Sequence, residues 1–155
     1  MGITSAICST FKKELMTATH NFTTTSGNTM KVALIKAQAS QTGTYSAATT
    51  SYTTITGNSD ELANGSGYTT GGNSLTNVTP TNGTSTTTTA LTDFADSSWT
   101  SATFTTRGCV IYNDTASGDP AVMVIDFGAD YSVAGGTFTI QFQTADESNA
   151  ILRIT

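Results

Sequence analysis

The chain has 155 residues, of which only 11% are charged, and its formal net charge is −5. That length fits a single domain, and threonine, which makes up about a fifth of the residues, is a β-branched residue that favours strands. Residues 1–36 carry four lysines against one glutamate, while the remainder is acidic. No stretch resembles a basic groove and no apolar run is long enough to cross a membrane, so we expect neither nucleic acid nor membrane as a partner.

The first predicted element is a helix near the N-terminus. Apolar residues recur there at helical spacing, and Lys12, Lys13 and Glu14 lie off the apolar stripe. Ser9 or Thr10 is placed to cap the start of this helix. The stripe consists of Phe11, Leu15, Ala18 and Phe22.

The N-terminal segment, residues 1–28, must have its apolar stripe covered, because an isolated helix this short is marginal in water. Two alternatives are open. The segment either packs against the rest of its own domain, residues 29–155, or docks as an arm on a neighbouring subunit or particle, where its lysines meet acidic groups. In the second alternative, the partner-binding residues are Phe11, Lys12, Lys13, Leu15 and Phe22.

Short strands separated by turn signals fill residues 29–155. Residues 30–37 predict a central strand, because both of their faces are mostly apolar, and residues 45–55 are ambiguous between a helix and a strand. Residues 80–83, Pro-Thr-Asn-Gly, predict a hairpin turn. About seven to nine short strands of this kind predict a mainly β, single-domain β-sandwich or jelly roll. The remaining strands are expected at residues 74–79, 86–94, 103–112, 121–127, 137–143 and 150–154.

Two of these strands have patterns that predict burial. Residues 121–127 form a near-continuous apolar run, and residues 137–143 alternate strictly between apolar and polar side chains. The expected core therefore includes Ile111, Val122, Val124, Ile125, Phe138, Ile140 and Phe142.

Few side chains suit catalysis or metal binding. His20 is the sole histidine and is expected to cap the helix end or to pack at the surface, so neither a Ser-His-Asp triad nor a zinc site is expected. The adjacent carboxylates Asp60-Glu61 and Asp146-Glu147 are expected to be solvated loop acids. We therefore expect no enzymatic activity, no cofactor and no metal.

The remaining reactive or aromatic side chains also favour structural roles. Cys8 and Cys109 match no disulfide framework, and lysines follow the apolar stretch 3–7 instead of preceding it as in a signal peptide, so we expect free thiols in a protein made in a reducing cytoplasm. Residues 113–119 are rich in oxygen ligands but lack the EF-hand spacing, which favours a turn. Trp99 is expected to be a core plug beneath a loop, and stacking on sugars together with the tyrosines is the alternative.

The order of several motifs resembles that of a family of small structural proteins of tailed phages. The resemblance covers nearly the whole chain. It opens with a short helix, a strand, a loop and a second strand at residues 11–16, 31–35, 67–72 and 75–78. It continues through residues 93–96, Trp99, and residues 107–113, 121–128, 136–140 and 149–154.

This resemblance implies a non-enzymatic virion protein that is made in the host cytoplasm. The leading hypothesis is a capsid decoration (cement) protein, which binds the major capsid protein or other virion proteins as a homo-oligomer, with a trimer favoured. Binding to the assembled lattice but not to its separated subunits would stabilise the head by mass action. A tail or head–tail connector component is the second hypothesis, and a glycan-binding module of a fibre is the third.

Overall fold

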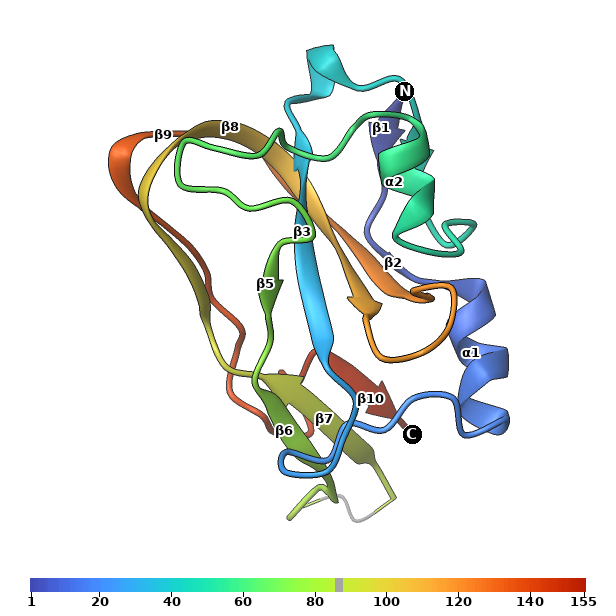
Figure 1. Ribbon diagram of the computed structural model, residues 1–155. Coiled ribbons are helices and arrows are strands. Elements are labelled where there is room, and N and C mark those ends of the chain that lie inside the picture. The colour runs from blue at the N-terminus through green and yellow to red at the C-terminus, as the bar shows by residue number, and fades with distance from the viewer. Residues whose placement is uncertain (86–87) are drawn as a thin grey trace.

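The computed structural model describes residues 1–85 and 88–155, and the protein is mainly β with a short N-terminal helix (Figure 1). None of the described helices is long and apolar enough to span a membrane. The helices of the described part are α1 (Ser9–Met16), α2 (Thr53–Gly57) and the 3-10 helix η1 (Gln38–Ser40). Its strands are β1 (Gly2–Ile3), β2 (Ala6–Ile7), β3 (Met30–Lys36), β4 (Thr44–Tyr45), β5 (Asn73–Ser74), β6 (Asn77–Asn82), β7 (Ala90–Phe94), β8 (Ser97–Asn113), β9 (Ala121–Ile140) and β10 (Leu152–Ile154).

A long antiparallel hairpin of β8 and β9 is the centre of a five-stranded sheet with the order β2-β9-β8-β3-β5. The strands expected at residues 121–127 and 137–143 are parts of the single strand β9. Gly128 and Gly135 lie within β9 with φ values of +83° and +66°, at places where the register with β8 shifts, as in a β-bulge. The hairpin bends over half-way along its length (Figure 1).

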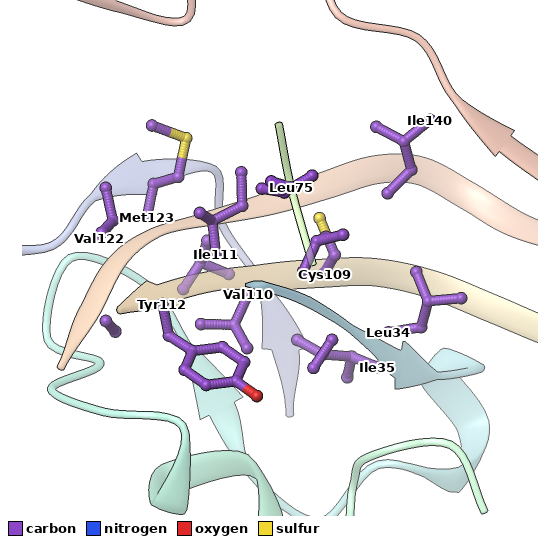
Figure 2. Close-up of a cluster of buried hydrophobic side chains, with 14 of the residues drawn as sticks. Leu34, Ile35, Leu75, Cys109, Val110, Ile111, Tyr112, Val122, Met123 and Ile140 are labelled. Carbon is purple, nitrogen blue, oxygen red and sulfur yellow. The ribbon is translucent and has the colours of Figure 1, made fainter. Parts of the chain in front are cut away.

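The core lies where this hairpin pairs with β3. Met30 to Ile35 pair one to one with residues of β8 in a continuous antiparallel register. All residues of this run except Lys31 are fully buried. Figure 2 shows Leu34 and Ile35 of β3 beside Val110 of β8. The central position expected for this strand is therefore confirmed.

The expected core is confirmed in part. Ile111, Val122, Val124 and Ile140 are buried, whereas three other expected core residues are only partly buried. Those three line a surface hollow of about 360 Å³ along β9 and the segment that follows it. Alternation identified one face of the strand correctly, but no second layer covers that face completely. The partly buried residues are Ile125, Phe138 and Phe142.

Two smaller sheets complete the fold, which is mainly β and consistent with a β-sandwich. One has the order β10-β7-β6 and the other pairs β1 with β4. β6 and β7 pair antiparallel, as the expected hairpin requires, although β6 continues through Pro80 to Asn82, so the turn begins later than expected. Proline is tolerated because β6 is an edge strand and its register shifts there. Part of the strand expected at residues 86–94 lies outside the described residues, and β7 begins at Ala90.

The N-terminal segment packs on the rest of the chain. β1 pairs with β4 and β2 pairs with β9, which corresponds to the first of the two alternatives for residues 1–28. The helix is shorter than its stripe suggested, because α1 ends at Met16 and Ala18 has a positive φ of 54°. Cys8, and neither Ser9 nor Thr10, occupies the N-cap position, with no side-chain capping bond.

Candidate functional site

Helix α1 and the segment after it present an aromatic cluster to the three-stranded sheet. The ring of Phe11 lies 4.8 Å from that of His20 and meets the ring of Phe22 edge-on at 6.1 Å. Phe22 in turn lies 6.2 Å from Phe94 of β7. Both Phe11 and Phe22 are buried, so the cluster fixes the helix relative to the sheet.

His20 is buried, in contrast to the expected capping or surface position. Its Nε2 lies 2.9 Å from Oε2 of Glu14, and its Nδ1 lies 3.1 Å from Nδ2 of Asn113. The Asn113 amide is oriented by its Oδ1, which accepts hydrogen bonds from the main-chain N–H groups of Thr115 and Ala116. Nδ2, the donor group of the amide, therefore faces Nδ1 of His20. This contact holds the end of the helix against the turn between β8 and β9.

An open groove of about 810 Å³ lies between α1 and strands β7 and β10. Phe11 and Leu15 line it from the helix, and Leu91, Leu152 and Ile154 line it from the strands. Leu15 is partly buried and Ile154 is 62% exposed. We call this feature the α1–β10 groove. Its lining is mostly apolar, and the described residues of the chain leave it open.

Among the residues that the structure describes, the α1–β10 groove is lined by basic side chains and by no acidic side chain. Lys12 and Arg153 are among its lining residues. Within the described part of the chain, neither Lys12 nor its neighbour Lys13 has an ion-pair partner. Arg153 donates hydrogen bonds to the main-chain carbonyls of Glu147 and Ser148, which fix the position of its guanidinium group. An apolar ligand with acidic flanks therefore complements the groove.

Four of the five predicted partner-binding residues line the α1–β10 groove. These are Phe11, Lys12, Leu15 and Phe22, whereas Lys13 is exposed on the helix and is not part of the lining. The sequence did not identify the opposite wall, because its residues come from the C-terminal half of the chain. The one available signal was the mostly apolar composition of residues 150–154, which does not reveal what that strand faces. The residues missed are Leu91, Leu152, Arg153 and Ile154.

The expectation that Asp60 is a solvated loop acid is wrong, because its side chain is fully buried. Its carboxylate accepts hydrogen bonds from Oη of Tyr45 at 2.5 Å and from the main-chain N–H groups of Thr42 and Gly43. Burial alone would raise the pKa of Asp60, but these hydrogen bonds outweigh it and hold the pKa below its usual value. The segment turns inward because the N–H of Lys36 donates to the carbonyl of Asp60, which places it beside β3.

Glu61 is also buried and serves as an acceptor for hydroxyl groups. Oη of Tyr52 donates to its Oε2 at 2.6 Å, and Oη of Tyr68 donates to its Oε1 at 2.7 Å. The N–H of Gly71 adds a third hydrogen bond at 2.6 Å. Asp60 and Glu61 therefore have separate sets of partners, and each set joins distant loops to the core.

Asp93 and Asp126 also have separate partners. Asp126 forms an ion pair with Arg107 at 2.7 Å, while Asp93 is buried and accepts hydrogen bonds from the N–H groups of Phe94 and Ile151. Burial raises the pKa of Asp93, and these two hydrogen bonds offset part of that effect. In residues 1–85 and 88–155, no group of three or more His, Cys, Asp or Glu side chains could hold a metal ion.

The aromatic residues proposed for sugar stacking are mostly buried. Trp99 is 3% exposed, which confirms the expected core position, and Tyr68 stacks beside it at 6.3 Å. Tyr45 and Tyr112 are buried as well. These four rings are buried and cannot stack on a sugar, whereas Tyr131 is 50% exposed.

The predictions for the two cysteines and for the oxygen-rich turn agree with the structure. Cys8 and Cys109 are both free and fully buried. Residues 113–119 form a turn between β8 and β9, in which Asn113 binds local main-chain groups and Asp114 pairs with Lys31 at 3.1 Å.

Comparison of the chain with protein-family models, curated proteins and solved structures finds no significant match in any of the three. The resemblance to phage virion proteins therefore depends on its motifs alone.

Proposed function

We propose that this chain is a non-enzymatic structural component of a tailed-phage virion, and specifically a capsid decoration protein that stabilises the head. The α1–β10 groove is the observation that carries this proposal, because it offers an open apolar lining with Lys12 and Arg153 beside it. The order of motifs that resembles small phage virion proteins supports the same conclusion.

In this role the α1–β10 groove receives an apolar segment of the major capsid protein that is flanked by acidic residues. Burial of apolar surface contributes about 25 cal/mol per Å² to binding, and the cations favour an acidic segment over a basic one. Because the protein binds the assembled lattice in preference to separated subunits, the binding free energy adds to the stability of the lattice.

The groove is tested by Leu15→Glu and Ile154→Glu. Both side chains are at least partly exposed in the free protein, so the fold should tolerate the carboxylates. We expect binding to purified undecorated heads to fall by about tenfold or more, because a charge placed in an apolar contact loses its hydration. Met16→Glu is the matched control, since Met16 is 83% exposed on the same helix and does not line the groove.

Unchanged binding by both groove variants, with wild-type melting behaviour, would rule out the groove as the docking site. Position in the virion is a separate measurement. A decoration protein is present in proportion to the capsid subunits, whereas a head–tail connector is present in far fewer copies per particle. The motif resemblance also supports the connector, so localisation in an image reconstruction of the particle distinguishes the two candidates.

A further inference from the structure

The outer side of β9 is unpaired over its second half. The strand pairs with β8 along its length, but on its other side it pairs only with β2, at Met123 and Val124. Within the described residues, no main-chain to main-chain hydrogen bond reaches that outer side beyond Val124. Residues 131–134 keep an unbroken register with β8, and this stretch, which we call the free edge, ends at the bulge of Gly135.

The composition of the free edge favours addition of another strand. Natural edge strands are usually protected by lysine, proline or inward-pointing charges, and the sequence Tyr-Ser-Val-Ala of the free edge contains none of these. Tyr131 is 50% exposed, and Ser132 and Ala134 are also exposed. The nearest charge is that of Asp130, whose carboxylate already accepts a hydrogen bond from the N–H of Gln38 at 3.0 Å.

The strand that best matches this edge is the same edge of a second copy. Most other open-sided strands in the described part are too short, because β1, β2, β4 and β5 have two residues each and β10 has three. β8 also has no described strand on its outer side before Thr106, but there the N–H of Thr103 donates to the carbonyl of Ser66, and Nδ2 of Asn73 donates to the carbonyl of Ser98. β6 is longer, but it contains Pro80, and Thr24 binds Asn77 and Thr79 along it. We propose that two copies of this chain join their free edges in antiparallel fashion about a two-fold axis, which extends the five-stranded sheet across the dimer.

The sequence of the free edge selects one register, with Ser132 on the two-fold axis. Tyr131 of each copy then faces Val133 of the other, and directly opposed aromatic and β-branched side chains stabilise antiparallel pairs. Asp130 faces Ala134, so the two carboxylates do not meet. A register centred on Val133 would instead place Tyr131 opposite the bulge at Gly135, which interrupts the ladder.

This arrangement is a dimer and differs from the trimer favoured by the sequence resemblance. A trimer needs two different complementary surfaces on each subunit, whereas a two-fold pair uses one surface twice and closes on itself. Pairing through the free edge leaves the α1–β10 groove available, because none of the residues that line the groove belongs to the edge. The inference is therefore independent of the proposed role in the virion.

Sedimentation equilibrium of the purified full chain tests the dimer. The wild-type protein should have twice the mass of one chain, and Ser132→Lys should weaken association by about tenfold or more, because like charges directly opposite one another destabilise a strand pair. Ser117→Lys is the control, since Ser117 is exposed in the turn between β8 and β9 and carries the same change of charge. A monomeric or trimeric wild-type mass, or a dimer that persists in Ser132→Lys, overturns the proposal.

A cysteine at the axis tests the register. Since Cys8 and Cys109 are fully buried, Ser132→Cys introduces the only accessible thiol among the described residues. Opposed Cα atoms in antiparallel strands lie about 4.5–5.5 Å apart, which is within the range of a disulfide. Air oxidation should give a covalent dimer for Ser132→Cys but not for Ser117→Cys. Equal cross-linking of the two variants would contradict the register and the two-fold pairing.

Discussion

Nδ1 of His20 lies 3.1 Å from Nδ2 of Asn113, and this contact joins the segment after α1 to the end of β8. Asn113 is fully buried and also donates to Oδ1 of Asn28 at 3.0 Å. One amide therefore connects two parts of the N-terminal segment with the β8–β9 turn. Its removal leaves Nδ1 of the buried His20 without a partner and takes the acceptor away from the N–H groups of Thr115 and Ala116.

We expect Asn113→Ala to lower the free energy of unfolding by about 2–4 kcal/mol, because the unpaired groups keep the cost of their lost hydration. Urea denaturation followed by circular dichroism measures this loss. Asn149→Ala, in an exposed loop, is the control and should change stability by less than about 0.5 kcal/mol. A similar small effect for Asn113→Ala would mean that water replaces the amide.

The stability of the protein should fall in acid partly through Asp60. The pKa of Asp60 in the folded protein lies below the value of about 3.9 expected in the unfolded chain. Its ionised form therefore stabilises the fold above that unfolded value, and the contribution is lost as pH falls through the folded pKa. Asp60→Asn should melt well below wild type at pH 6, and the difference between them should narrow by pH 2–3. A constant difference over this range would exclude Asp60 as the titrating group.

Gly72 should be irreplaceable for a steric reason. Its φ is +73°, and a Cβ atom there would lie 1.9 Å from the carbonyl oxygen of Val32. We expect Gly72→Ala to cost more than about 3 kcal/mol, since the backbone of β3 would have to move. Gly118→Ala shares the positive φ but meets nothing within 4 Å, so it should cost only about 1–2 kcal/mol. Thermal melting of the two variants separates the steric clash from the cost of the dihedral angle alone.

Cys8 and Cys109 should be unreactive in the folded protein. Burial, with a smaller effect of Glu14, raises the pKa of the Cys8 thiol to about 12, and burial raises that of Cys109 as well. Because the thiolate is the reactive form, Ellman's reagent at pH 8 should label neither residue until urea unfolds the chain. Labelling of two thiols per chain without denaturant would contradict the burial of both residues.

The sequence predicted the elements whose evidence is local. The near-continuous apolar run at residues 121–127 was expected to be buried. Its first four residues, Ala121 to Val124, are buried, because a strand covered on both faces needs no polar side, whereas Ile125 and Phe127 are only partly buried. Phe138 was also expected in the core, because residues 137–143 alternate between apolar and polar side chains. Alternation identifies one face of a strand, but it does not show how completely another layer covers that face. Phe138 packs beside Trp99 and still borders the surface hollow.

The buried carboxylates and the groove depended on non-local contacts. Glu61 is buried because Tyr52 and Tyr68 donate hydrogen bonds to it, and composition gave no signal that these phenols would converge. Similarly, Leu15 was expected to contact a partner, but its opposite wall at Ile154 becomes visible only when the chain is folded. The candidate site was thus predicted on one side only.

The pairing of β2 with β9 has a consequence for synthesis of the chain on the ribosome. Ala6 and Ile7 emerge long before Val124 and Met123, the residues with which they pair. Pairings this distant in sequence are slow to form, because a large loop must close first. β1 can pair with β4 early in synthesis, because Thr44 and Tyr45 follow within the first third of the chain. β2 can pair only after β9 has left the exit tunnel, so α1, which follows β2, lacks its final neighbours while most of the chain is translated.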